Sequence, residues 1–221
     1  GSDVTLTVDA DLQRRVMERL RQERRGAVVA LDVATGEVVT LASVPEFDPT
    51  DIVGGLSNQS WRRLLSSSTR PMFNRATGGL YPPGSTFKIV TALAALQAGV
   101  VSPGERIECN GSFKLGGQTF RCWNRDGHGR NNLHRALAES CDVYFYELAR
   151  RTGIEAIAAM ARRLGLGDTS PIEIANQKAG LIPTPDWKRG QFGSPWLAGE
   201  TILAGIGQGY VLTTPLQLAV M

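Results

Sequence analysis

Long hydrophobic runs and an excess of one charge are both absent from this sequence. No apolar run in the 221 residues reaches the length of about 18 residues that spans a membrane. The 24 Lys and Arg residues nearly balance the 21 Asp and Glu residues, which leaves a net charge of +3. Because no basic cluster with interleaved aromatic residues is present either, nucleic-acid binding is not expected. Apolar residues at 42% and charged residues at 20% are typical of a globular domain and exclude a disordered tail or a coiled coil.

The two ends of the sequence predict that it belongs to a longer chain. Gly1-Ser2 is typical of the scar that a tag leaves behind. The last residues, 214–221, predict a proline-started helix that stops in the middle of its pattern, whereas natural termini usually end in polar residues. We therefore expect residues 3–221 to be the N-terminal part of a domain.

Strand signals are few. Two β-rich runs, 27–33 and 37–44, flank Ala34-Thr35-Gly36, whose turn chemistry predicts a hairpin. Residues 104–130 are rich in glycine and predict loops and a short hairpin, and residues 45–84 predict irregular structure. A lone two-stranded hairpin is only marginally stable in water, so this sheet needs further strands or covering helices.

Helical patterns are stronger. A helix capped by Asp9 or Asp11 is expected to end at Gly26. Residues 86–98 are almost wholly apolar, which predicts a buried helix. Further helices are expected over residues 131–139 and 143–164. The combination predicts an α/β or α+β fold with an incomplete sheet.

Lysine is scarce, with four among the 24 basic residues, so a lysine within a motif is informative. Lys88 lies three residues after Ser85 in Tyr81-Pro82-Pro83-Gly84-Ser85-Thr86-Phe87-Lys88. Positions i and i+3 at a helix start share a face, so the amine can approach the hydroxyl. A lysine that burial keeps neutral can then accept the serine proton. The spacing alone also arises by chance, and the catalytic interpretation rests on the rigid Pro-Pro-Gly entry and on a lone buried charge that needs a partner or a function.

A second candidate motif is Ser140-Cys141-Asp142. Ser140 and Asp142 are two residues apart, so both side chains can point the same way from a loop. A hydroxyl relay and a polar anchor beside a Ser-Lys pair would suit acyl transfer. The alternative is a helix N-cap formed by Ser140 or Asp142.

Together these motifs resemble the class B penicillin-binding proteins. Ser85-x-x-Lys88 followed by Ser140-x-Asp142 matches the first two signatures of the penicillin-recognising acyl-serine enzymes. The similarity extends to Asn74-Arg75-Ala76, Gly127-His128-Gly129 and Gly205-Ile206-Gly207-Gln208-Gly209. Pro185-x-Trp187-Lys188 and Pro195-Trp196 resemble the elongation-specific penicillin-binding protein 2 subgroup. The resemblance covers essentially the whole chain and implies the α/β (α+β) penicillin-binding-protein/β-lactamase-like transpeptidase fold, its central antiparallel sheet incomplete because the C-terminal strands are missing.

The resemblance implies a peptidoglycan D,D-transpeptidase that cross-links stem peptides during cell elongation and is a target of β-lactams. Ser85 would attack the D-Ala-D-Ala bond to form an acyl-enzyme, and Lys88 would be the base. Ser140 would pass the proton to the leaving D-Ala, and Asp142 stands where many relatives have Asn. The Ser85 backbone N–H would supply half of an oxyanion hole.

The resemblance also implies partners and a location. The partners would be stem peptides, β-lactam antibiotics and a membrane glycan polymerase of the elongation machinery. The domain would lie at the periplasmic face of the bacterial inner membrane, anchored by an N-terminal helix outside this sequence. The family's third signature, Lys-Thr-Gly or Lys-Ser-Gly on an edge strand, does not occur in the sequence. We therefore expect this chain to be inactive by itself. The alternatives are another penicillin-recognising enzyme and a β-lactam-sensing domain.

The cysteines form a separate pattern. Cys109, Cys122, His128 and Cys141 follow the spacing C-x12-C-x5-H-x12-C, and four N/S ligands match a closed structural zinc site. Such a site keeps no open position for water, so no catalytic cofactor is expected. Cys141 should point away from its two neighbours in the second motif. The alternatives are a Cys109–Cys122 disulfide and unrelated buried thiols. His134 is expected at the surface.

Overall fold

The computed structural model describes residues 2–221, so Gly1 of the predicted tag scar lies outside the described residues. No helix among these residues is long and apolar enough to cross a membrane. The chain forms two compact units. The first contains residues 2–80, 169–179 and 214–221, and the second contains residues 81–168 and 180–213.

The first unit is built on an antiparallel hairpin of β1 (Gly26–Leu31) and β2 (Val38–Val44). The carboxylate of Asp32 closes the turn by accepting hydrogen bonds from the backbone N–H of Ala34 at 2.7 Å and of Thr35 at 3.0 Å. These two hydrogen bonds, with that of Ala34 first, lower the pKa of Asp32 because they stabilise the ionised carboxylate. The hairpin predicted from the sequence is confirmed.

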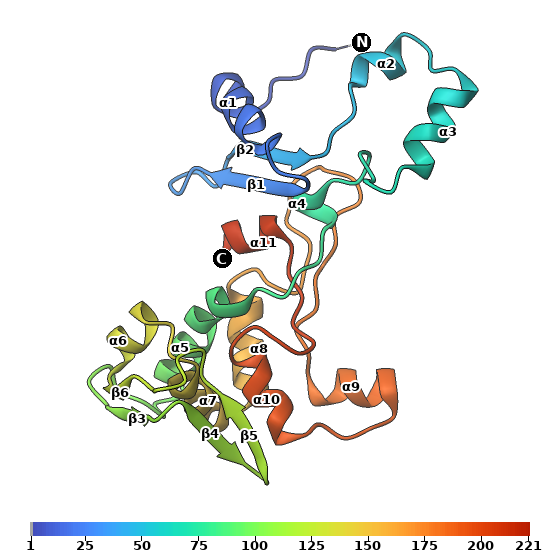
Figure 1. Ribbon diagram of the computed structural model, residues 1–221. Coiled ribbons are helices and arrows are strands. Elements are labelled where there is room, and N and C mark those ends of the chain that lie inside the picture. Colours follow the sequence, from blue (N-terminus) through green and yellow to red (C-terminus); the bar gives the residue numbers. More distant parts are fainter. Residues whose placement is uncertain (1) are drawn as a thin grey trace. The chain divides into compact units, whose positions relative to one another are not determined.

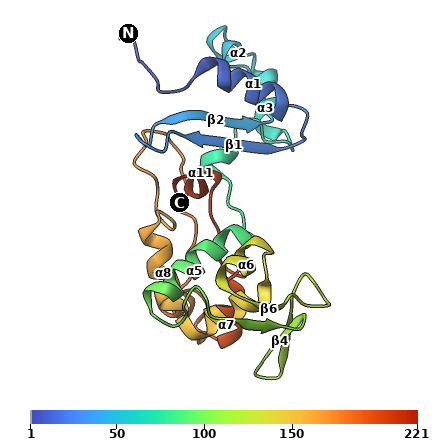
Figure 2. The same cartoon turned by 90° about the vertical axis from the view of Figure 1, so that its left-hand side faces the viewer.

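Helices cover both faces of this hairpin. α1 (Ala10–Leu20) lies on one face, and α11 (Pro215–Val220) and α4 (Arg75–Gly78) lie on the other (Figures 1 and 2). The proline-started helix predicted at residues 214–221 is confirmed: α11 begins after Thr214, whose hydroxyl accepts from the backbone N–H of Gln217 at 3.1 Å.

α1 begins where the sequence predicts and ends earlier. Asp9 is its N-cap and accepts a hydrogen bond from the backbone N–H of Leu12 at 2.9 Å. Met17 and Leu20 are buried against β2. The helix does not continue to Gly26, because Gly26 already belongs to β1.

The prediction that residues 45–84 are irregular is wrong. This stretch contains α2 (Pro49–Val53), α3 (Asn58–Ser66) and α4. Each helix begins at a polar cap, namely Asp48, Ser57 or Asn74. Asp, Ser and Asn favour turns as much as helix starts, and the helices are short, so the sequence pattern resembled a loop.

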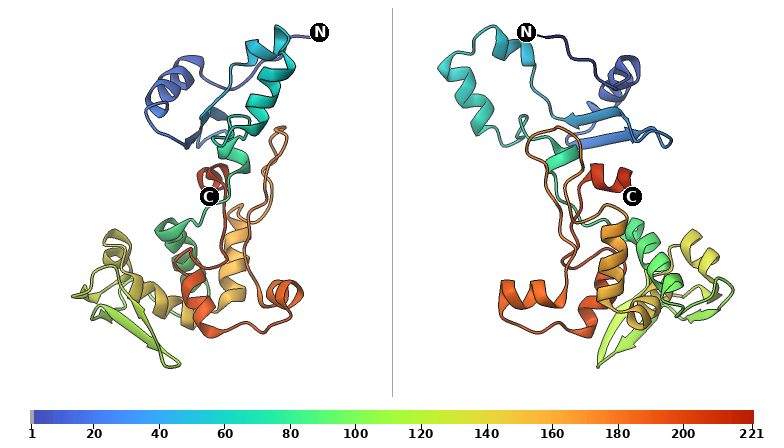
Figure 3. Two further views of the ribbon diagram at one scale, coloured as in Figure 1. Left: turned by 45° about the vertical axis from the view of Figure 1, so that its right-hand side comes forward. Right: turned by 180° about the vertical axis from the view of Figure 1, so that it is seen from behind.

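The second unit is centred on four helices that pack together (Figure 3). They are α5 (Lys88–Gln97), α7 (Asp142–Thr152), α8 (Ile154–Arg163) and α10 (Ala198–Ala204). The buried helix predicted at 86–98 is confirmed as α5, which follows a 3-10 turn over Gly84–Phe87. The single helix predicted at 143–164 is two helices, because Gly153 adopts φ 81° and ends α7.

Short strands and two further helices complete this unit. β3 (Ile107–Cys109) pairs with β6 (Gly129–Asn131), and β4 (Ser112–Leu115) pairs with β5 (Gln118–Arg121), both antiparallel. α6 (Leu133–Ala138) and α9 (Pro185–Phe192) are the remaining helices of the described chain. Every sheet within residues 2–221 has two strands, which agrees with the expected incomplete sheet.

Two glycines bring the Gly205–Gly209 segment into direct contact with the turn that carries Ser85 and with α7. Gly207 adopts φ 67°, and a Cβ there would lie 2.4 Å from the carbonyl oxygen of Gly84. The backbone N–H of Gly84 donates to the carbonyl oxygen of Gly207 at 3.0 Å. A Cβ at Gly205 would lie 2.4 Å from the Cβ of Ala149 in α7. These contacts leave no room for a side chain.

We predict that Gly207→Ala lowers the free energy of unfolding by about 2–4 kcal/mol, because the methyl group overpacks the turn and the left-handed backbone is strained. The matched control is Gly190→Ala in α9, where a Cβ would meet nothing within 4 Å. That variant should be as stable as the parent or up to about 1 kcal/mol more stable. Urea unfolding measures both, and equal midpoints would contradict the close approach.

Candidate active site

Ser85 is presented to solvent by a turn whose other side is buried. It lies in the 3-10 turn Gly84–Phe87 and is exposed, whereas the ring of Phe87 is buried beneath the turn. Gly84 adopts φ 57°, a conformation that favours glycine. The Pro-Pro-Gly entry therefore places the hydroxyl at the surface, one turn before α5.

Lys88 is the first residue of α5, and its side chain is 1% exposed. Its Nζ donates to the carbonyl oxygen of Ser140 at 2.8 Å, to Ser140 Oγ at 3.0 Å and to Asp142 Oδ1 at 2.7 Å. The ring of Phe145 lies 5.6 Å from Nζ. These three acceptors match the three donors of a lysine ammonium group, and Lys88 and Asp142 form an ion pair. Asp142 is the partner that a lone buried charge requires.

Ser140 connects the lysine to the exposed serine. Its Oγ accepts from Lys88 and donates to Ser85 Oγ at 2.8 Å. The sequence predicts a direct approach of Lys88 to Ser85, and the structure joins them through Ser140 instead. Ser140 adopts φ 52°, a left-handed conformation that costs a residue other than glycine about 1–3 kcal/mol. Strain of this kind is typical of functional sites.

The second motif is not a plain helix cap. The N-cap of α7 is Cys141, which makes no side-chain capping hydrogen bond, and Asp142 is the first helical residue. Ser140 and Asp142 instead both point toward Lys88, as their spacing predicts. The second carboxylate oxygen, Asp142 Oδ2, accepts from the backbone N–H of Trp123 at 2.9 Å.

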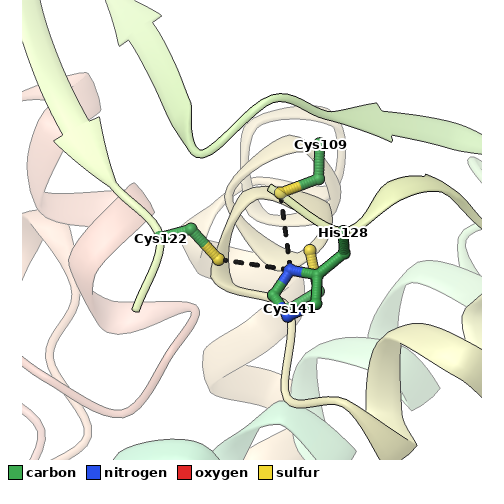
Figure 4. Close-up of side chains that lie close together, drawn as sticks. All are labelled: Cys109, Cys122, His128 and Cys141. Carbon is green, nitrogen blue, oxygen red and sulfur yellow. Dashed lines mark hydrogen bonds between the residues drawn. The ribbon is translucent and has the colours of Figure 1, made fainter. Parts of the chain in front are cut away.

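The four predicted metal ligands lie together (Figure 4). The ligand atoms of Cys109, Cys122, His128 and Cys141 are all within 4.8 Å of one another. His128 Nδ1 lies 3.6 Å from Cys109 Sγ and 3.6 Å from Cys122 Sγ. A tetrahedral zinc ion with Zn–S near 2.3 Å and Zn–N near 2.0–2.1 Å requires ligand atoms about 3.6–3.8 Å apart. The two distances from His128 match this value, and no other pair of these ligand atoms is more than 4.8 Å apart.

Backbone contacts aim His128 at the sulfur atoms. The backbone N–H of His128 donates to the carbonyl oxygen of Cys109 at 3.0 Å. Gly127 adopts φ 83°, and a Cβ there would lie 2.2 Å from the same oxygen, so the close approach requires glycine. The three cysteines are free and buried, so the alternative Cys109–Cys122 disulfide is not formed. Burial raises the pKa of the Cys141 thiol to about 12. Cys141 faces the cluster, away from its neighbours in the second motif, and His134 is exposed as expected.

Two further features of this unit were not predicted from the sequence. Trp123 contacts both residues of the second motif, and its only sequence signal is its place directly after Cys122. Lys188 enters the sequence reasoning only as part of a resemblance, yet it is buried and donates to Glu200 Oε1 at 2.5 Å. Glu200 also accepts from the backbone N–H of Leu197 at 2.7 Å, so this ion pair holds the start of α10.

Comparison with known proteins identifies the class. The family described as penicillin binding protein transpeptidase domain matches residues 26–221. The chain belongs to this family. Among its relatives, peptidoglycan D,D-transpeptidase MrdA of Acinetobacter baumannii is 41% identical over 99% of this chain and 33% of the relative. MrdA of Escherichia coli K12 is 40% identical over 99% of this chain and 35% of the relative. The chain thus spans about a third of the length of these curated relatives.

Solved structures confirm the transpeptidase fold. Pseudomonas aeruginosa PBP2, in complex with WCK 5153, matches with a TM-score of 0.94 and 41% identity over 100% of this chain and 50% of that chain. Helicobacter pylori PBP2 matches with a TM-score of 0.91 and 34% identity over 96% of this chain and 40% of that chain. The resemblance to the class B penicillin-binding protein 2 subgroup is confirmed.

We predict that Asp142→Asn destabilises the chain by about 2–4 kcal/mol, because buried Lys88 loses its counter-charge and the new NH2 group faces a donor of Lys88 or Trp123. The matched control is Asp186→Asn, since the Asp186 side chain is 93% exposed and its ion pair with Arg189 is solvated. That change should stay within about 0.5 kcal/mol. Urea denaturation compares them, and a shift in neither or in both would refute the role of Asp142.

Proposed function

We propose that the protein is a peptidoglycan D,D-transpeptidase that acts through an acyl-serine intermediate. The observation that carries this proposal is the hydrogen-bonded chain from Ser85 through Ser140 to Lys88 and Asp142. The names of the MrdA relatives support it. Penicillin-binding protein A of Mycobacterium tuberculosis, 29% identical, has been solved as a ceftriaxone acyl-enzyme complex, which supports the serine intermediate.

In the first step, Ser85 Oγ attacks the carbonyl carbon of the D-Ala-D-Ala peptide bond. Lys88 is the base, and it must first give up one proton, for which Asp142 Oδ1 at 2.7 Å is the acceptor in contact. The Ser85 proton then passes to Ser140 Oγ, and the Ser140 proton passes to Lys88. The C–N bond breaks, an ester forms on Ser85, and the leaving D-Ala amine takes the proton back through Ser140.

In the second step, an amine of a neighbouring stem peptide attacks the ester. The amine gives up one proton through Ser140 to Lys88, and a new peptide bond closes the cross-link. The C–O bond of the acyl-enzyme breaks, and Ser85 Oγ takes that proton back from Lys88 through Ser140. Negative charge that develops on the carbonyl oxygen is stabilised by the backbone N–H of Ser85, which supplies half of an oxyanion hole. The Ser140 hydroxyl lies within proton-transfer distance of Ser85 in both steps.

The partners and location follow from this chemistry and from the relatives. β-Lactams would acylate Ser85 in place of the stem peptide. Helicobacter pylori PBP2 has been solved in complex with MreC, and a 37% identical relative has been solved in a peptidoglycan synthase complex that coordinates polymerization and crosslinking. We accordingly place the domain at the periplasmic face of the inner membrane, beside a membrane glycan polymerase of the elongation machinery.

We also propose one structural zinc ion, held by Cys109, Cys122, His128 and Cys141. Two observations support this site: His128 Nδ1 lies 3.6 Å from two of the sulfur atoms, and all three cysteines are buried. The ion would hold together residues 104–130, a stretch with few apolar side chains to anchor it. With four protein ligands, the ion would have no open coordination position. Cys141 lies between Ser140 and Asp142, so fixing its sulfur fixes the backbone of the second motif and leaves both polar side chains aimed at Lys88.

We predict that Ser85→Ala in the full-length protein abolishes labelling by fluorescent penicillin, because Ser85 is the exposed hydroxyl that Ser140 connects to Lys88. Ser102→Ala is the control, since Ser102 is exposed in the same unit, and it should leave labelling unchanged. Unchanged labelling of the Ser85 variant would refute the assignment. Release of D-Ala with formation of cross-linked product separates a transpeptidase from a β-lactam sensor, which would be labelled without turnover.

We predict that metal analysis of the purified full-length protein returns about one zinc ion per chain. His128→Ala should lose most of that zinc, because it removes the only nitrogen ligand. His134→Ala changes the other histidine of the sequence, which is exposed, and should retain it. Less than ~0.2 zinc per chain in the wild type, or a Cys109–Cys122 disulfide, would overturn the proposed site.

A further inference from the structure

Trp123 is 63% exposed, yet both of its N–H groups are engaged. An exposed tryptophan contributes little burial of apolar area, so its fixed hydrogen bonds require another explanation. The residue directly follows the buried Cys122, and its ring meets the ring of His128 edge-on with centroids 5.3 Å apart. These contacts hold the indole in one orientation beside the second motif.

The indole N–H binds the backbone around Ser140. Nε1 donates to the carbonyl oxygens of Glu139 and Ser140, both at 3.1 Å. The Ser140 carbonyl is the same oxygen that accepts from Lys88 at 2.8 Å. Since Ser140 adopts the left-handed φ of 52°, its peptide group needs such partners to stay in place.

The backbone N–H of Trp123 binds the other half of the motif. It donates to Asp142 Oδ2 at 2.9 Å, while Lys88 donates to Asp142 Oδ1. Trp123 therefore contacts both residues that accept hydrogen bonds from Lys88 Nζ. Each of its two N–H groups fixes one of them.

We propose that Trp123 is a positioning residue for acyl transfer. Trp123 binds the Ser140 carbonyl and the Asp142 carboxylate. It thereby keeps Ser140 Oγ at hydrogen-bond distance from Ser85, and it keeps the acceptors of Lys88 in place. This inference rests on the proposed transpeptidase function. Trp123 acts through Ser140 and Asp142, so its loss should slow the acylation step rather than weaken the initial binding of the β-lactam.

The test replaces Trp123 in the full-length protein in two ways. Trp123→Phe removes the indole N–H and keeps an aromatic ring and the backbone N–H. Replacement by the isosteric benzothienylalanine removes only the N–H and fills the same volume, so it decides the question if Trp123→Phe fails to fold. Stopped-flow acylation by fluorescent penicillin over a range of concentrations yields the acylation rate constant and the dissociation constant separately.

Both variants should acylate about tenfold to a hundredfold more slowly, as expected for misplaced reacting groups. Their dissociation constants should stay within about twofold of the wild type, which a general loss of structure would not produce. Trp61→Phe, in α3 of the first unit, is the control and should react like the wild type. Wild-type rate constants in the isosteric variant would overturn the role of Trp123 alone. A wild-type protein that takes no label would instead overturn the proposed function, and this inference with it.

Discussion

The buried ammonium group of Lys88 is the constraint on which the rest of the site depends. A side chain that is 1% exposed and charged is stable only if every donor has a partner. Ser140 supplies two acceptors and Asp142 the third, so the position of the lysine fixes the second motif. The same arrangement leaves Ser140 Oγ free to reach Ser85. The contacts that pair the buried charge of Lys88 therefore also place Ser140 Oγ beside the Ser85 hydroxyl.

Close backbone packing supports this arrangement from both sides. Gly207 lies directly against the turn of Ser85, and Gly205 lies against α7, each in a place that no side chain could share. On the far side of the second motif, Cys141 faces Cys109, Cys122 and His128, the other three candidate metal ligands. The serine turn and the second motif are therefore each held in place by parts of the chain outside the two motifs.

Asp142 accepts hydrogen bonds from two different parts of the chain through its two carboxylate oxygens. A carboxylate gives Lys88 a full counter-charge at 2.7 Å and still has an oxygen left for the backbone N–H of Trp123. An amide would keep an oxygen at only one of these two positions and would place an NH2 donor at the other, facing the donor of Lys88 or of Trp123. The aspartate thus connects the loop of Trp123 to Lys88 through a single side chain. In the proposed mechanism, Lys88 must lose a proton from this ion pair before it can act as the base.

Local chemistry in the sequence determined much of this protein. The turn residues predicted the hairpin, and an apolar run of helical length predicted α5. Motif spacing predicted the eight candidate site residues. Each of these signals lies within a few neighbouring residues or in a characteristic interval. Short helices such as α3 were missed, since a polar cap also favours a turn. Tertiary structure alone decided that Ser140 bridges Lys88 and Ser85 and that Trp123 binds both Ser140 and Asp142. Those hydrogen bonds join positions as far as 55 residues apart, and only the packed chain brings them within reach.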